Sequence, residues 1–159
     1  MNVEYGLVFY DIPTGNTKLY HKVHRLMRRN CLPVNLSVCL FDWGLKDHLK
    51  TSLEDIGAFS NSSIQLIKFD TSSKEQIEAI ATKQLEKVFQ VIQSNLSATI
   101  TRLNNLEKKE EYLDRVTRKL KDYENVLKLY SFANRVGPAL NILKQTVATE
   151  YKYIQGQQI

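Results

Sequence analysis

The sequence predicts an α+β protein, with a split βαβ domain over residues 1–72 followed by an all-α extension over residues 73–159 that is either a helical bundle or a coiled coil. Two observations predict this division. Four of the six glycines and two of the three prolines lie before residue 58, whereas residues 58–136 contain neither. Glycine and proline punctuate short alternating elements, and a long stretch without them favours long helices.

The composition is that of a folded protein with a mildly basic balance. Hydrophobic residues make up 43% of the 159 residues, which suffices for a packed core, and the formal net charge is +5. Such a charge is compatible with a nucleic-acid partner. Cys31 and Cys39 are too few for a disulfide framework. Because no signal-peptide pattern and no membrane-spanning apolar run occurs, we expect a cytoplasmic protein without membrane association.

The first elements follow from an apolar run, a turn and an amphipathic stripe. Residues 5–12 predict a central strand, because they are nearly continuously apolar. Residues 13–17 form a turn that can cap a helix. Residues 18–30 predict that helix, whose inward stripe is Leu19, Val23, Leu26 and Met27.

The remaining elements of the first domain complete a sheet. Residues 36–43 predict a strand that ends at Gly44, and residues 32–41 are either one bent strand or two strands paired by a bulge. Residues 46–59 predict a second helix, and residues 63–69 a last strand. This order of strands and helices is that of the ferredoxin-like, or split βαβ, arrangement.

The second half has a different period. Apolar residues, with one threonine among them, recur at spacings of four or three on both sides of the charged residues 107–111, as in a heptad pattern; the members are Ile77, Ala81, Leu85, Val88, Ile92, Leu96, Thr99, Leu103, Leu106, Leu113, Val116, Leu120, Tyr123, Leu127 and Tyr130. Residues 75–135 are either one rod of about 90 Å or a hairpin broken near residues 104–111. We favour the hairpin, because a third helix over residues 138–155, after Gly137-Pro138, also needs a surface to cover its apolar stripe.

The first 70 residues resemble the small CRISPR-associated family of the spacer-integration complex. The resemblance rests on Tyr10-Asp11-Ile12 at the end of the first strand, the basic helix of residues 21–29, and Ser37-Val38-Cys39-Leu40-Phe41 in the next strand. The virulence-associated protein D ribonucleases are similar in fold and in the early aspartate. The family stops soon after its fourth strand, so the additional 85 or so helical residues suggest a specialised relative.

Asp11 has two interpretations. The resemblance implies a homodimer in which the Asp11 carboxylates of two subunits hold Mg²⁺ or Mn²⁺ and catalyse phosphodiester hydrolysis, so that Asp11 is both the metal ligand and the catalytic residue. One carboxylate per chain is a poor metal site by itself. The alternative is a structural role, in which Asp11 caps the turn or the helix that follows.

Basic residues gather on the first helix. Lys18, Lys22, Arg25 and Arg29 form one stripe with Arg28 on its flank, and no acidic residue interrupts it. Such a stripe can follow a nucleic-acid backbone, or it can be a solvated surface. His21 and His24 fit the solvated surface best, because no third metal ligand lies near them in the sequence. Trp43 could stack a base, but a packing role is favoured.

We therefore expect a homodimeric protein that binds DNA or RNA, with a metal-dependent endonuclease activity as one option. The rival hypothesis is a non-catalytic assembly or adaptor protein, whose helices in residues 73–159 bind a protein partner. No phosphate-binding glycine loop, nucleophile elbow or zinc-ligand set occurs in the sequence.

Overall fold

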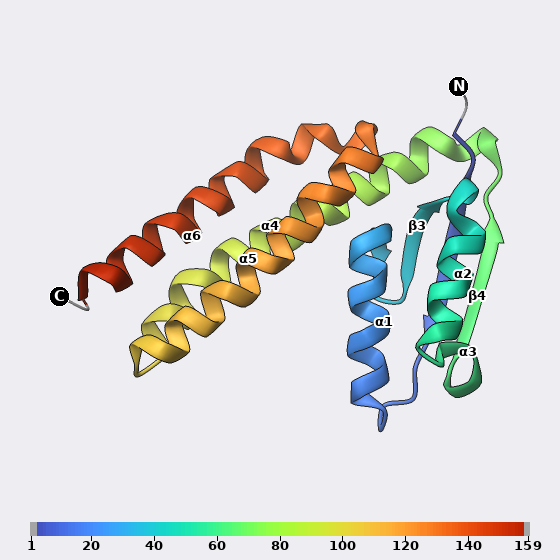
Figure 1. The fold of residues 1–159 in the computed structure, drawn as a ribbon. Helices are drawn as coiled ribbons and strands as arrows, with labels where there is room; N and C mark the ends of the chain where they lie inside the picture. Colours follow the sequence, from blue (N-terminus) through green and yellow to red (C-terminus); the bar gives the residue numbers. More distant parts are fainter. Residues whose placement is uncertain (1–2, 158–159) are drawn as a thin grey trace. The chain divides into compact units, whose positions relative to one another are not determined.

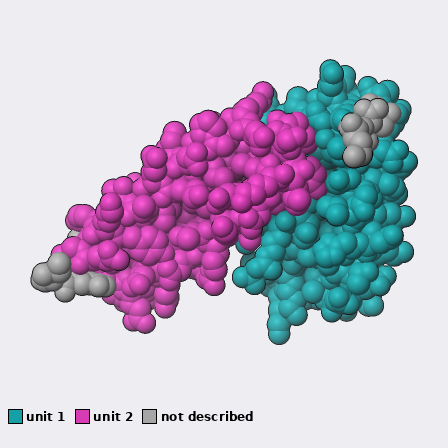
Figure 2. All heavy atoms as spheres, turned by 45° about the horizontal axis from the view of Figure 1, so that its top comes forward, with its two compact units in different colours: residues 1–84 teal, residues 85–159 magenta. Residues whose placement is uncertain are grey.

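A computed structural model describes residues 3–157, with only the backbone described for Thr71 and Gln157 (Figure 1). It confirms the α+β class. The chain divides into two compact units, residues 1–84 and 85–159 (Figure 2). Within the described range, no helix is both long enough and apolar enough to cross a membrane.

The first unit is built on a four-stranded antiparallel sheet with the strand order β2-β3-β1-β4. The strands are β1 (Tyr5–Asp11), β2 (Leu32–Asn35), β3 (Val38–Asp42) and β4 (Ser63–Lys68). The strand β3 lies between β1 and β2, and β1 lies between β3 and β4. One strand–helix–strand segment runs from β1 to β2 and the other from β3 to β4, so a strand of each segment lies between the two strands of the other. The strand β1 is central, as its apolar sequence predicts.

The helix α1 (Thr17–Asn30) follows β1 and matches the predicted range within one residue. Asn16 is its N-cap, because the Asn16 side-chain oxygen accepts a hydrogen bond from the Leu19 backbone N–H at 3.2 Å. Helices α1 and α2 (Lys46–Asp55) cover the same face of the sheet (Figure 1).

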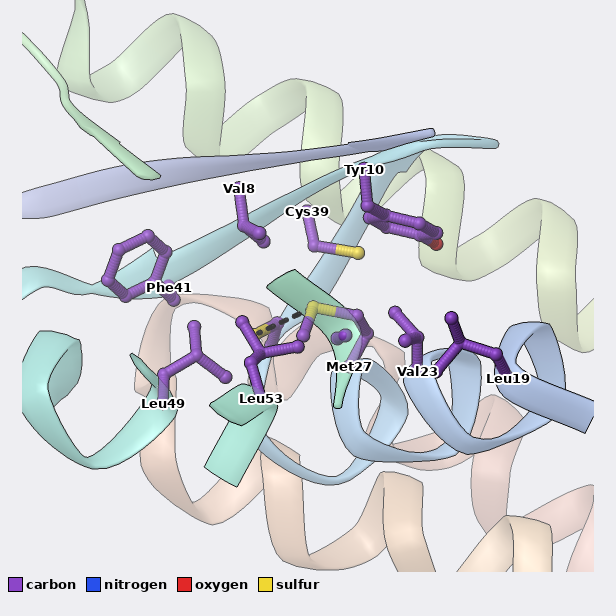
Figure 3. Close-up of a cluster of buried hydrophobic side chains, with 11 residues drawn as sticks. Val8, Tyr10, Leu19, Val23, Met27, Cys39, Phe41, Leu49 and Leu53 are labelled. Atoms are coloured by element: carbon purple, nitrogen blue, oxygen red, sulfur yellow. Dashed lines mark hydrogen bonds between the residues drawn. The ribbon is translucent and has the colours of Figure 1, made fainter. Parts of the chain in front are cut away.

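The core of the first unit lies between that face and the two helices (Figure 3). The strands contribute Val8, Tyr10, Cys39 and Phe41, and the helices contribute Leu19, Val23, Met27, Leu49 and Leu53. Burial raises the pKa of the Cys39 thiol to about 12. This thiol is therefore protonated at neutral pH and packs as a small apolar group, as the sequence predicts for Cys39.

The segment of residues 32–41 forms two strands rather than one bent strand. The strands β2 and β3 pair around a turn at Leu36 and Ser37, with a register shift between Pro33 and Asn35. Two hydrogen bonds connect the end of β1 to this turn. The Tyr10 backbone N–H donates to the Ser37 carbonyl, and the Tyr10 hydroxyl donates to the Leu36 carbonyl, both at 3.1 Å.

The prediction of one helix over residues 46–59 is wrong. The helix α2 ends at Asp55, and the single helical turn α3 (Ala58–Asn61) begins after Gly57. Gly57 has a φ of +71°, a left-handed conformation that terminates a right-handed helix and that glycine adopts without a steric penalty. Short 3-10 turns, η1 (Trp43–Leu45) and η2 (Thr71–Ser73), flank this part of the chain.

The long helical region is broken, as the hairpin hypothesis predicts, and a continuous rod is excluded. Helix α4 (Lys74–Arg102) ends shortly before α5 (Leu106–Leu129) begins. The side-chain oxygen of Asn105 accepts a hydrogen bond from the Lys108 backbone N–H at 2.8 Å and caps α5. The edge-to-face contact of Phe89 with Tyr123, at 5.3 Å between ring centroids, joins α4 to α5.

The heptad positions predicted from the sequence match the buried residues better in α5 than in α4. In α5 the predicted residues Leu113 and Leu120 are buried. In α4 the buried residues include Phe89 and Ile100 in place of the predicted Val88 and Thr99, which are only partly buried. A straight helix has 3.6 residues per turn, whereas a strict heptad assumes 3.5, so the heptad positions gradually rotate away from the buried side of the helix. The shifts from Val88 to Phe89 and from Thr99 to Ile100 follow from this geometry.

The helix expected to continue to residue 135 ends earlier. Helix α5 stops at Leu129, the 3-10 segment η3 (Ser131–Val136) follows, and Gly137 and Pro138 open α6 (Gly137–Gln157). Proline suits the first turn of a helix, where its missing N–H leaves no hydrogen bond unmade. The ion pair between Lys144 and Glu124, at 3.0 Å, joins α6 to α5.

The division into compact units falls inside α4, whereas the sequence places a domain boundary between residues 72 and 73. The first turns of α4 are tied to β1. The Tyr5 hydroxyl donates a hydrogen bond to Glu78 Oε1 at 2.7 Å, and the Lys74 ammonium lies 5.6 Å from the centroid of the Tyr5 ring. These contacts explain why the start of α4 belongs to the first unit.

Candidate functional site

Asp11 is the last residue of β1 and is exposed. It pairs in register with Ser63 of β4. Successive side chains of a strand point to opposite faces. Because the Tyr10 side chain packs in the core under α1 and α2, the Asp11 carboxylate projects from the sheet face that these two helices do not cover.

The structure assigns the capping role to Asn16 instead of Asp11. The Asn16 side chain makes the N-cap hydrogen bond of α1, and the Asn16 backbone N–H donates to the Pro13 carbonyl at 2.9 Å to close the connecting turn. The capping interpretation of Asp11 therefore has no support in this turn.

Asp11 also has few acidic or metal-binding neighbours within its own chain. Among residues 3–157, no group of three or more His, Cys, Asp or Glu side chains lies close enough to hold a metal ion together. A site for Mg²⁺ at Asp11 would need further oxygen ligands, from a second copy of the chain, a nucleic acid or water.

The predicted basic residues all lie on α1. Lys18, Lys22 and Arg25 are exposed along one edge of the solvent-exposed face of the helix, next to the buried stripe that includes Val23. Arg28 and Arg29 lie in the last turn, where positive charge is favourable next to the helix dipole. Arg29 is exposed and Arg28 is partly buried, and both arginines also interact with other groups of the protein.

Helix α1 carries positive charge that no acidic residue interrupts. Helix α1 contains five Lys and Arg residues and no Asp or Glu. The whole chain has 22 basic and 17 acidic residues. Residues 1–72 contain 8 basic and 7 acidic residues, and residues 73–159 contain 14 and 10, so the two parts carry net charges of +1 and +4; the five cations of α1 are offset by acidic residues elsewhere in residues 1–72.

A cluster of rings, which the sequence reasoning did not identify, lies on the same helix. The Tyr20 ring is stacked on the His24 ring with an interplanar angle of 11° and meets the His21 ring edge-on at 73°; both pairs have centroids 5.7 Å apart. All three residues are exposed. Tyrosine four residues before histidine on a polar helix face is the sequence signal that could have found this cluster.

Asp11 and the basic stripe lie on different surfaces of the first unit. The stripe lies along one exposed edge of α1, on the helix-covered side of the sheet, and the Asp11 side chain projects from the other face of the sheet. Within one chain, the structure does not bring the proposed catalytic carboxylate and the proposed phosphate-binding residues onto one surface.

Trp43 has a packing role. Its side chain packs against the core of the first unit next to Phe41, with ring centroids 5.8 Å apart, and the Lys46 ammonium lies 4.8 Å from the centroid of the Trp43 ring. This arrangement agrees with the packing role favoured by the sequence.

The second unit carries a groove between α4 and α6. The groove has a volume of about 230 Å³ and is lined by Glu86, Phe89, Gln90, Gln93, Ala139, Ile142 and Leu143. Ile142 is largely exposed. An open groove with an apolar lining is a feature of protein-binding helical surfaces.

No family model matches the chain, and neither does any curated protein or any solved structure.

Proposed function

We propose that the protein binds the phosphate backbone of nucleic acid through the exposed side of α1. The five Lys and Arg residues of α1, with no acidic residue among them, carry the proposal. Lys18, Lys22 and Arg25 lie along one side of α1 with the spacing of successive helical turns. Cations arranged in this way bind phosphates by releasing counterions and do not read base sequence.

The proposal includes a ferredoxin-like topology for the first unit and a cytoplasmic homodimer related to the CRISPR adaptation family. The strand order β2-β3-β1-β4, with both strand–helix–strand segments split, supports that topology. The sequence of residues 10–12 and the basic helix support the relationship. The proposal of a homodimer rests on Asp11, because one carboxylate needs further ligands to hold a metal ion and a second copy of the chain can supply them.

Replacement of two stripe residues should weaken nucleic-acid binding. For Lys22→Ala/Arg25→Ala we expect about a tenfold loss of affinity at 0.1 M salt, because two phosphate contacts disappear. The slope of log K against log[salt] should become shallower by about 1.4 for a single strand. Fluorescence anisotropy of labelled DNA and RNA 20-mers, over a series of salt concentrations, measures both quantities.

The matched control for this experiment is Lys87→Ala/Lys152→Ala, which removes the same charge from exposed positions on α4 and α6. It should retain the affinity and the salt slope of the wild type. Equal losses in the two double variants would contradict a specific role of α1, and binding that does not depend on salt would contradict backbone recognition.

The catalytic activity that we propose for this protein is metal-dependent hydrolysis of phosphodiester bonds. If two chains bring their Asp11 carboxylates together around Mg²⁺ or Mn²⁺, Asp11→Asn should abolish cleavage of labelled RNA or DNA that depends on the metal. The thermal unfolding midpoint should stay unchanged, because Asn16, rather than Asp11, caps α1. Cleavage that survives in Asp11→Asn would assign the activity to another site.

The second candidate function is that of an adaptor without catalytic activity, in which the helices of residues 73–159 bind a protein partner. The groove between α4 and α6, with Ile142 at its edge, favours this candidate. The nucleic-acid titrations separate the two candidates, because an adaptor of this kind does not require a salt-dependent interaction of α1 with nucleic acid.

A further inference from the structure

We infer that α1 recognises single-stranded nucleic acid, with Tyr20 as the platform on which an unpaired base stacks. This inference rests on the proposed function, because it names the substrate class of the same helix. It depends on the ring cluster of Tyr20, His21 and His24, which backbone binding by the basic stripe does not require.

The ring cluster and the basic stripe occupy the two edges of one exposed helix face. At about 100° of rotation per residue, Tyr20 and His24 fall on one edge, and Lys18, Lys22 and Arg25 fall on the other. The His21 ring lies between the edges. A nucleic-acid strand whose phosphates follow the basic stripe can therefore extend its bases across the helix toward the rings.

The geometry of the cluster suits stacking. Tyr20 as a whole residue is 41% exposed, although its side chain is largely apolar. The near-parallel stack with His24 and the edge contact with His21 support this ring from its own helix. A ring that is held in place before binding loses little conformational freedom when a base stacks on it.

Stacking discriminates between single and double strands. An unpaired base offers its flat face to an aromatic side chain, whereas the bases of a duplex are stacked on one another. The phosphates are present in both. The basic stripe alone would therefore bind both forms, and the ring cluster adds affinity for the single strand only.

The experiment compares a labelled single-stranded 20-mer of mixed sequence with the duplex that contains it, using the full chain. The wild type should bind the single strand more tightly than the duplex. Tyr20→Leu should weaken binding of the single strand at least about fivefold, the lower limit for loss of one stacked base. Binding of the duplex and the salt slope should not change, because no phosphate contact is removed.

Two further variants separate stacking from other effects. Tyr20→Phe keeps the ring and should bind the single strand as the wild type does. Tyr153→Leu makes the same replacement as Tyr20→Leu at a tyrosine of α6 that is 62% exposed, and it should have no effect. Far-UV circular dichroism and thermal melting check that each variant is folded.

The outcomes distinguish this inference from the function on which it rests. If single strand and duplex bind equally and Tyr20→Leu changes neither, base stacking is wrong and backbone binding stands. If Tyr20→Leu weakens both forms equally, the ring acts through the helix and the inference is also wrong. If neither form binds, the proposed function fails and the inference fails with it.

Discussion

Gly6→Ala should destabilise the first unit by about 2 kcal/mol, in the range of an overpacked core. Gly6 lies in the central strand opposite Phe41. A Cβ atom at Gly6 would lie 2.5 Å from Phe41 Cζ and 2.6 Å from Trp43 Cε3. Both rings pack in or against the core, so neither can move away without disturbing its neighbours.

Trp43 makes this prediction simple to measure, because it is the only tryptophan of the chain and it contacts the substituted position. Its fluorescence during guanidinium denaturation should show a lower midpoint for Gly6→Ala than for the wild type. Gly15→Ala is the matched control, because nothing lies within 4 Å of a Cβ atom there. An unchanged midpoint for Gly6→Ala would show that the rings are not packed as described.

Leu113→Ala should destabilise the second unit by about 3 kcal/mol, within the range for a large cavity in a core. Leu113 belongs to the apolar seam of α5 and is fully buried, at 0% exposure. The substitution removes the transfer free energy of the missing atoms and leaves a cavity that neighbouring helices fill only in part.

Leu129→Ala provides the comparison within the same helix, because the Leu129 side chain is 56% exposed. It should change the free energy of unfolding by less than about 0.5 kcal/mol. Denaturation followed by far-UV circular dichroism reports on this helical unit. Similar midpoints for the two variants would contradict the burial of Leu113.

The first two elements were predictable because two signals agree in each. In β1 a run of apolar residues ends before Pro13, and in α1 an apolar stripe of helical period follows a turn that can cap it. Where a single signal was available, the prediction was less accurate. The helical pattern of residues 46–59 continues through Gly57, and only the backbone conformation of that glycine shows where α2 ends.

The candidate site was predictable in its residue types but not in its arrangement. The basic stripe follows from helical spacing alone, and its exposed members lie where that spacing places them. Asp11 could not be placed from the sequence, because whether it or Asn16 caps α1 depends on the path of the turn between them. The spacing of Tyr20 and His24 indicates that their side chains are neighbours, but the stacking of their rings depends on side-chain rotamers, which the sequence does not specify.

The uninterrupted positive charge of α1 has a consequence for kinetics. A helix with five cations and no anion creates a local positive potential, and a polyanion approaching from solution is attracted toward it before contact. Encounters are then oriented in advance, so a larger share of collisions is productive. The location of the charge, more than its modest total, would set the rate of association.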